Sequence, residues 1–212
     1  LVIAGGVMTW IVVTDGIRDI SSSLSNSLIP VYLEGIANMN AQQIGWLSSI
    51  LGVAMMITSF PAGHLSDKHG ERLAIALGFG LQSIGFFIFI KAETFLIYAV
   101  SYFIIGVGFS LMSPAYQSLL SKVLPQRLRG TGFGLVQSGL GLFSLPAPAI
   151  GARLYANISP TTPFWITAWA SLFAIVPVVF KFKLTDKDRQ QIEKAEAKVE
   201  AGDGSAQEQP NL

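Results

Sequence analysis

The sequence predicts an all-α membrane protein with six transmembrane helices, and three observations carry that prediction. Hydrophobic residues make up 51% of the 212-residue chain, charged residues only 13%, and the mean hydropathy is +0.53. A soluble domain would carry about a quarter charged residues. Six apolar stretches follow one another, each about long enough to cross a bilayer as a helix, which takes roughly 20 residues. The cations between these stretches also alternate from one side to the other.

The six expected spans are separated by short polar connections. The first and the fourth are long enough to be tilted or to project beyond the lipid. We place the spans at Leu1–Leu33, Ala41–Leu65, Leu73–Ile90, Thr94–Leu120, Gly130–Tyr155 and Pro163–Phe180. Pro61 and Gly63 are expected to end the second span. Prolines inside the other spans remove backbone hydrogen bonds and predict kinks, which serve either bent packing or hinges.

The cations predict the orientation of the chain. Only Lys91 and Arg153 lie near one side of the membrane. The other side carries Lys68, Arg72, Lys122, Arg127, Arg129, Lys181 and Lys183. By the positive-inside rule this second side is cytoplasmic. Six spans then put both termini in the cytoplasm of a multi-pass protein of the plasma or inner membrane.

The chain divides into a membrane region and a polar tail. Eleven of the charged residues follow Leu184. We therefore expect a membrane region over residues 1–183 and a cytoplasmic tail over residues 184–212, a short helix capped near Thr185 and then disorder. Because the chain begins at Leu1 without a Met or a signal peptide, we expect it to be part of something longer.

Several function classes are excluded by composition. The chain has no cysteine, which excludes disulfides, thiol catalysis and thiolate metal sites. His64 and His69 lie in one connection but give no metal-ligand set without further donors. No basic run points to nucleic acid. We therefore expect no metal, no cofactor and no nucleic-acid partner.

A cluster between the second and third spans carries a family resemblance. The stretch Gly63–Arg72 resembles the signature between the second and third helices of each half of major facilitator superfamily transporters. The matching residues are Gly63, Leu65, Ser66, Asp67, Lys68, Gly70 and Arg72. Glu71 departs from the pattern, because the family usually has a basic residue there. In the family this loop latches the two halves together on the cytoplasmic face.

Residue chemistry agrees with a gating loop at Gly63, Asp67, Lys68, Gly70 and Arg72. The two glycines would permit a tight turn and close backbone approach. Asp67 could accept hydrogen bonds from the N-terminus of a neighbouring helix. The two cations would anchor the loop at the cytoplasmic headgroups, and Glu71 would weaken the latch.

Two further stretches resemble the same family. Leu124–Leu135 is similar to the basic loop and glycine-rich helix start between the fourth and fifth helices of a half. Its glycines would let helices approach closely. Ala147–Ala152 looks like a weakened form of the fifth-helix motif of the family's antiporters. Since alanines replace two of that motif's glycines, it does not imply antiport.

The resemblance implies one six-helix half of such a transporter, built from two inverted three-helix repeats. Tyr102 stands where N-terminal halves often carry an Arg, and the chain ends in a short tail, which favours the C-terminal half. The implied function is secondary transport of a small solute by alternating access, symport or antiport, and not an enzymatic reaction. The implied partners are the lipid bilayer, the solute and the other half, in the same polypeptide or a second copy. A non-transporting sensor, structural subunit or inactive fragment is the alternative.

Polar residues on the first span predict the solute or ion pathway. At 100° per residue, five of them share one helix face: Asp15, Arg18, Asp19, Ser22 and Asn26. Facing lipid, the charges would be costly, so they must face protein or a water-filled cavity. Tyr102 and Gln117 on the fourth span could line the same cavity.

The three charges allow more than one role. Asp15 or Asp19 could be a proton-coupling carboxylate whose pKa responds to the solute and to Arg18. The three residues could instead form a permanent ion-pair cluster that holds helices together. As a third reading, Arg18 could bind an anionic solute.

Overall fold

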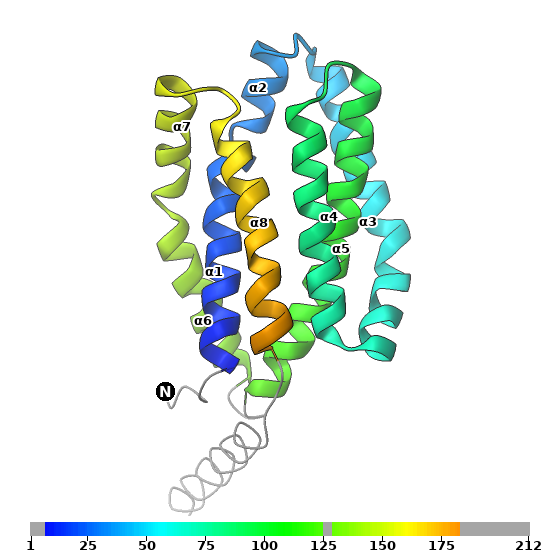
Figure 1. Cartoon of the computed structure of the whole chain (residues 1–212), viewed down its shortest axis with the longest axis vertical. Coiled ribbons are helices and arrows are strands. Elements are labelled where there is room, and N and C mark those ends of the chain that lie inside the picture. The colour runs from blue at the N-terminus through cyan, green and yellow to red at the C-terminus, as the bar shows by residue number, and fades with distance from the viewer. Residues whose placement is uncertain (1–6, 125–128, 183–212) are drawn as a thin grey trace, which may run out of the picture.

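The computed structural model describes residues 7–124 and 129–182, and this part of the chain is helical throughout (Figure 1). The polar tail expected over residues 184–212 lies outside the described residues. The described residues form eight helices: α1 (Val7–Asn26), α2 (Ile29–Gly35), α3 (Ala41–His69), α4 (Glu71–Ile90), α5 (Phe95–Val123), α6 (Arg129–Ser144), α7 (Ala147–Asn157) and α8 (Thr162–Lys181).

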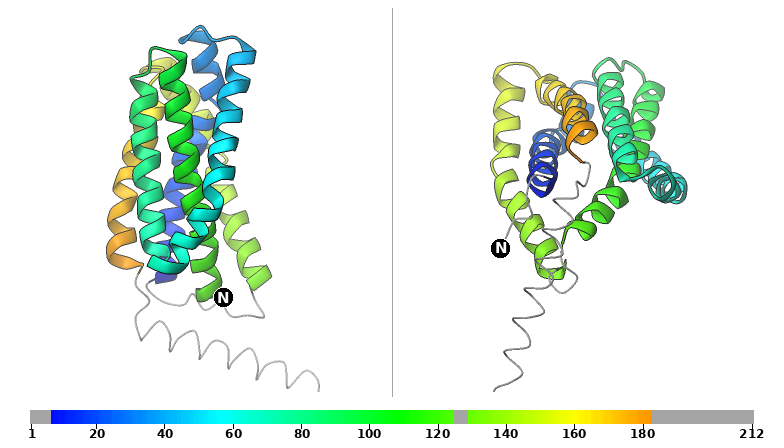
Figure 2. Two further views of the ribbon diagram at one scale, coloured as in Figure 1. Left: turned by 90° about the vertical axis from the view of Figure 1, so that its right-hand side faces the viewer. Right: turned by 60° about the horizontal axis from the view of Figure 1, so that its bottom comes forward.

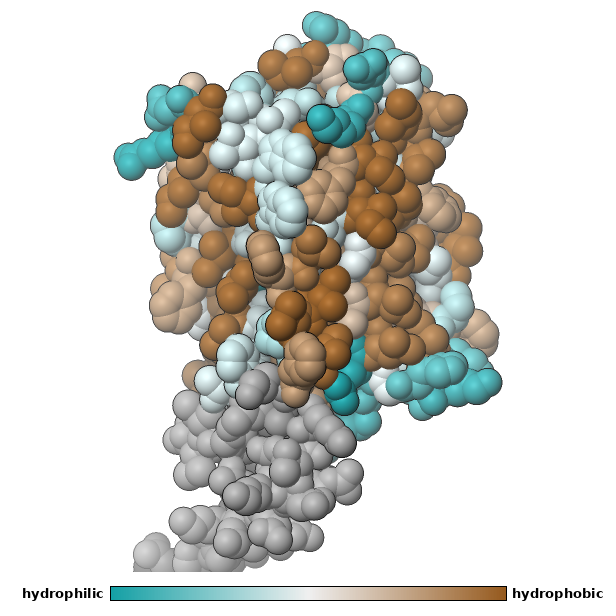
Figure 3. All heavy atoms as spheres, viewed as in Figure 1, coloured by the Kyte–Doolittle hydropathy of each residue, from teal (hydrophilic) through white to brown (hydrophobic). Residues whose placement is uncertain are grey.

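Five segments of the described chain are long and apolar enough to cross a membrane. They are α3, α4, α5, the stretch Arg129–Asn157 that joins α6 and α7, and α8. The helix α1 is not among them, since it carries Asp15, Arg18 and Asp19 within 20 residues. Figure 3 shows a broad hydrophobic band with hydrophilic residues gathered at its two ends, as on a protein embedded in a bilayer.

The break between the second and third spans is shorter than predicted. The helix α3 continues through Pro61 and Gly63 and ends only at His69. Gly70, with φ of 88° and ψ of 152°, alone separates α3 from α4. This left-handed φ suits glycine, which has no Cβ.

The predicted role of Gly63 in the turn is wrong. Gly63 lies inside α3, and a Cβ added there would meet no atom within 4 Å. Neither the turn nor a close helix approach therefore requires glycine at this position. A proline within a membrane helix removes only local hydrogen bonds, which explains why Pro61 did not end α3.

Prolines interrupt two other predicted spans. The first is broken at Ser27 and Leu28, before Pro30 in the first turn of α2. The fifth is broken at Leu145 and Pro146, where α6 gives way to α7. A proline lacks the N–H that would continue a helix and disfavours helical geometry in the residue before it. Each pair of helices therefore covers the depth of one expected span.

The helices pack in two groups that α4 and α8 join. In one group α5 lies against α3 and α4; in the other α1 lies against α6, α7 and α8 (Figure 2). Phe79 and Tyr116 belong to a core cluster at the end where α3 meets α4. Tyr32, Phe89 and Phe164 belong to a second cluster at the opposite end. The bundle therefore has two aromatic core layers at different depths.

Serine and threonine side chains join neighbouring helices through backbone carbonyls. The Ser25 hydroxyl donates to Pro163 O over 2.9 Å, and the Thr167 hydroxyl donates to Ser21 O over 2.6 Å. On the other side of α8, the Ser83 hydroxyl donates to Ala168 O over 2.9 Å. These buried bonds fix α8 between α1 and α4 without a charged group.

Small residues bring α4 and α5 into direct contact. A Cβ on Gly78 would lie 2.7 Å from Gly108 O and 2.3 Å from Met112 Cγ. A Cβ on Gly108 would lie 2.8 Å from Gly78 O and 3.0 Å from Gln82 N. Because backbone atoms cannot move aside cheaply, these two glycines are required by helix packing.

We expect Gly108→Ala to lower the free energy of unfolding by about 1–3 kcal/mol, the usual cost of overpacking a core. Gly134→Ala on α6 is the matched control, because a Cβ there meets no atom within 4 Å. That control should be neutral or slightly stabilising, since alanine favours helix. Unfolding in detergent, followed by circular dichroism, measures both. Equal stability of the two variants would contradict the close α4–α5 packing.

Candidate functional site

Two of the three charged residues of α1, Asp15 and Arg18, form an ion pair. Asp15 is 7% exposed, and its Oδ1 lies 2.8 Å from Nη2 of Arg18, one helical turn away. No hydrogen-bond donor is aligned with this oxygen, and no acceptor is aligned with the Nε–H of Arg18. The contact is therefore an ionic one that lacks good hydrogen-bond geometry.

The cation of this pair also lies over an aromatic ring. The Arg18 guanidinium carbon is 5.6 Å from the ring centroid of Tyr116 on α5. Tyr116 in turn packs edge-on against Phe79 and Phe182. Cation–π attraction of this kind strengthens when the groups are removed from water. Arg18 thus connects α1 to α5 in the core layer nearest the α3–α4 turn.

The second carboxylate has different surroundings. The Ser144 hydroxyl, buried at the end of α6, donates a hydrogen bond to Asp19 Oδ2. Asp15 therefore belongs to an α1–α5 cluster, whereas Asp19 bonds to a neutral hydroxyl of α6. The two carboxylates of the predicted pathway are not equivalent.

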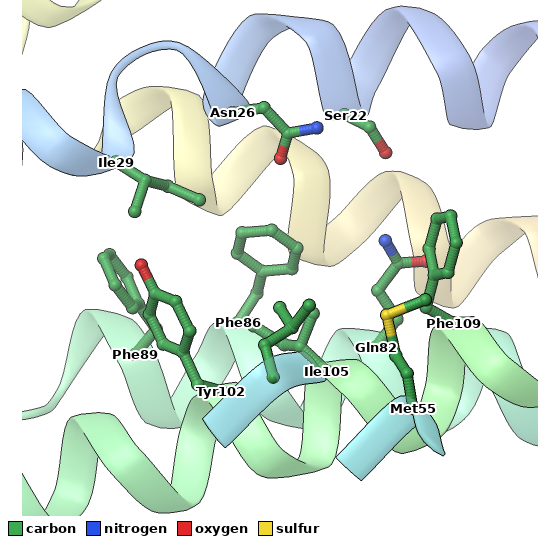
Figure 4. Close-up of a pocket in the computed structure, with 11 residues that line it drawn as sticks. Ser22, Asn26, Ile29, Met55, Gln82, Phe86, Phe89, Tyr102, Ile105 and Phe109 are labelled. Carbon is green, nitrogen blue, oxygen red and sulfur yellow. The ribbon is translucent and has the colours of Figure 1, made fainter. Parts of the chain in front are cut away.

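A cavity of about 230 Å³ lies between α1–α2 and the group α3–α5 (Figure 4). Most of its wall is apolar or aromatic, and its polar groups are hydroxyls and amides. The lining residues are Ser22, Asn26, Ile29, Leu51, Met55, Gln82, Phe86, Phe89, Tyr102, Ile105 and Phe109. None of these is an Asp, Glu, Lys, Arg or His. The cavity is therefore suited to an uncharged molecule with rings and hydrogen-bonding groups.

The structure divides the predicted pathway residues into two places. Ser22, Asn26 and Tyr102 line the cavity. The charged residues of α1 are not among its lining residues and lie earlier on the helix. Gln117 is exposed on α5 and does not line the cavity either.

Sequence reasoning missed Gln82, an amide that is 5% exposed in α4. Its signal was a single amide within a run whose mean hydropathy reaches 2.1. The cavity phenylalanines gave no signal at all, because aromatic residues in an apolar span are typical of packing.

The predicted gating residues lie where α3 turns into α4. Asp67 and Lys68 are exposed on the last turn of α3. The Arg72 guanidinium donates a hydrogen bond to Val179 O on α8. Gly70 is the turn itself.

Glu71, the departure from the family pattern, has partners of its own. Its carboxylate pairs with Lys122 at the end of α5 and accepts a hydrogen bond of 2.9 Å from Ser118 Oγ. The residue thus fastens the start of α4 to the end of α5.

Among the described residues no group of three or more metal-ligating side chains occurs.

Known proteins resemble this chain over most of its length. The Major Facilitator Superfamily profile matches residues 14–208. The quinolone resistance protein NorA of Staphylococcus aureus (strain MRSA252) is 26% identical over 149 residues, covering 70% of this chain and 38% of NorA. The riboflavin transporter RibZ of Clostridioides difficile (strain 630) is 25% identical over 180 residues, covering 76% of this chain and 39% of RibZ. The chain therefore spans about two-fifths of the length of these curated relatives.

A solved structure shares the fold. The crystal structure of a mutant peptide transporter POT in complex with sulfate superposes with a TM-score of 0.70 at 18% sequence identity, covering 93% of this chain and 44% of that one. At this identity the likeness concerns the fold alone. Together with the profile match, it makes this chain a multi-pass membrane protein that belongs to the Major Facilitator Superfamily.

Proposed function

We propose that this chain is one six-helix half of a membrane transporter that moves a small solute by alternating access, without enzymatic chemistry. The observation that carries the proposal is the cavity between α1–α2 and α3–α5, lined by rings, amides and hydroxyls, in a chain of this superfamily. Such a cavity can bind a solute and contains no metal-ligand cluster or nucleophile–base pair among its lining residues.

The sixth span of the proposal is α1 together with α2. Its charges contact α5 and α6, and these contacts offset part of the cost of crossing the membrane. The helix contacts support two inverted repeats. The helix α1 lies against α6–α7 and α8, as α5 lies against α3 and α4. In a chain of six spans, two spans that are three positions apart, such as the first and the fourth, cross the membrane in opposite directions.

The partner of the proposal is a second half. Only 11% of the apolar part of α3 and 17% of that of α6–α7 is buried, against 50% for α4. Phe60 on α3 and Phe143 on α6 are 86% and 74% exposed. We place the second half against these faces, in the same polypeptide or as a second copy. Tyr102, in place of the Arg of N-terminal halves, favours the C-terminal half for this chain.

The proposed gating surface is the α3–α4 turn on the cytoplasmic side. Arg72 and Glu71 hold it to α8 and α5, which leaves Asp67 and Lys68 exposed to meet the second half. Both termini, and with them the polar tail over residues 184–212, are then cytoplasmic.

Coupling to protons is the finer part of the proposal. Arg18 already contacts Asp15 and Tyr116, which disfavours it as a binding residue for an anionic solute. Asp19 has a hydroxyl partner and forms no ion pair with a cation among the described residues, which makes it the better placed of the two carboxylates to exchange a proton. We therefore propose Asp19 as the coupling residue and Asp15–Arg18 as a permanent ion pair.

The proposed orientation predicts which positions reagents can reach. This chain has no cysteine, so a cysteine introduced into it reports on its own site once the second half is also free of cysteine. We expect Glu93→Cys to react with a membrane-impermeant maleimide in intact cells, and His69→Cys to react only after permeabilisation. Both side chains are exposed, His69 just before the start of α4 and Glu93 just after its end, so accessibility within the fold is matched. The reverse labelling pattern would contradict the orientation.

Solute flux tests transport itself. In proteoliposomes of the complete protein, a proton gradient should accelerate the flux of at least one compound from a panel that includes riboflavin and a quinolone. Asp19→Asn should abolish that acceleration and leave downhill flux intact, because the asparagine cannot titrate. Glu34→Gln, exposed on α2, is the control. Gradient-driven flux that survives in Asp15→Asn/Asp19→Asn would exclude carboxylate coupling on α1, and no flux in the native protein would favour a sensor or structural subunit.

A double-mutant cycle tests the permanent ion pair. Arg18→Leu leaves Asp15 buried without its cation and should lower the free energy of unfolding by about 3–5 kcal/mol. In Asp15→Leu/Arg18→Leu most of that loss should disappear, since apolar pairs often replace buried ion pairs without cost. Reversible unfolding in mixed micelles gives the free energies of unfolding of the native protein, the two single variants and the double variant. Additive single effects would show that the two residues do not stabilise one another.

A further inference from the structure

We infer that the cavity selects an uncharged ring compound whose edge carries an adjacent hydrogen-bond donor and acceptor, as a lactam or an imide does, and that Gln82 recognises this edge. The inference rests on the proposed function, because it takes the cavity to be part of the solute route. The compounds that name NorA and RibZ differ at nearly equal identity, so the relatives alone do not give the substrate class.

Gln82 is buried without a complete set of partners. The side chain is 5% exposed, and its Oε1 has no hydrogen-bond partner in the described structure. Buried amide atoms are nearly always hydrogen-bonded, because leaving one unpaired is unfavourable. Because this oxygen is also closed off from the cavity, the side chain must turn for a solute to reach it. Once it has turned, a solute that supplies the missing partner binds more tightly than one that does not.

The amide is placed to meet a solute. In Figure 4 the Gln82 side chain extends from α4 toward α1, with its nitrogen facing the side of the cavity where Ser22 and Asn26 lie and its oxygen beside Phe109. Rotation about the last side-chain bond exchanges the two atoms. The amide can thus donate one hydrogen bond and accept another in a single plane. A ring that carries N–H next to C=O pairs with both atoms at once.

The remaining wall accounts for the ring and for the absence of charge. Phe86, Phe89, Tyr102 and Phe109 present aromatic surfaces, and Met55 adds a polarisable thioether. Since none of the lining residues that this chain supplies is an Asp, Glu, Lys, Arg or His, a charged solute would lose hydration against this wall without gaining a counter-charge from it.

A matched pair of probes tests the role of Gln82. Isocarbostyril is an uncharged two-ring lactam, and N-methylisocarbostyril differs by a methyl group that removes the donor. Equilibrium dialysis against the complete protein in nanodiscs, corrected with empty nanodiscs, gives both dissociation constants. We expect the native protein to bind the lactam about tenfold or more tightly than its methyl derivative, the usual effect of leaving a buried polar atom unpaired.

Gln82→Met keeps the length of the side chain and removes both hydrogen-bonding atoms. It should reduce the preference for the lactam to within about twofold, while binding of the methyl derivative is retained and shows that the variant is folded. Gln42→Met, exposed at the start of α3, is the control and should keep the native preference. Isoquinoline carboxylate should bind neither variant nor the native protein measurably.

Three results would overturn the inference. They are equal binding of the two probes by the native protein, an undiminished preference in Gln82→Met, and no binding of either probe. None of the three bears on transport, which the proteoliposome flux decides separately. Conversely, lost flux with an intact lactam preference would overturn the transporter and leave a binding site that Gln82 controls.

Discussion

The arrangement of this chain depends on keeping the charges of α1 out of lipid. Each charged side chain at the centre of a membrane helix costs about 2.5–3.5 kcal/mol on insertion scales. The cost is avoided because α1 is covered by other helices, with Arg18 against the Tyr116 ring and Asp19 hydrogen-bonded to Ser144. The serine and threonine bonds to α8 hold another side of α1. Val13 and Ile17, on the face opposite Asp15, remain exposed, so the charges of α1 meet protein while apolar side chains of the same helix face outward.

The same requirement explains why the polar stripe of α1 serves two environments. Near its start, Asp15 and Arg18 pair in an aromatic core layer. Near its end, Ser22 and Asn26 border a cavity without charged side chains. Hydroxyl and amide groups can face a partly open cavity at little cost, whereas the charges need partners supplied by the protein. Position along one helix face therefore separates the ionic cluster from the cavity surface.

The sequence predicted the positions of the spans better than it predicted which side chains contact one another. Hydropathy placed the apolar stretches, because a bilayer imposes the same length on each of them. The end of α3 was predicted too early at Pro61 and Gly63, since a proline in a membrane helix breaks only local bonds. Glu71 was expected to weaken the latch, because its partner Lys122 lies 51 residues further along the chain and is not apparent from the sequence. Gln82 was missed because one amide in an apolar run has no periodicity to mark it.

Separation of cavity and carboxylates limits how a solute could influence a proton. Ser22 lines the cavity, and Asp19 lies one turn earlier on the same face of α1. In the proposed mechanism, a solute that drew Ser22 toward the cavity would also shift Asp19 relative to Ser144, because a helix moves as a stiff unit over one turn. The Asp15–Arg18 pair moves with α1 and is not broken by the same shift, because both partners are on that helix. Proton coupling in this fold would therefore act through the hydrogen bond between Ser144 and Asp19. The Asp15–Arg18 ion pair would stay unchanged.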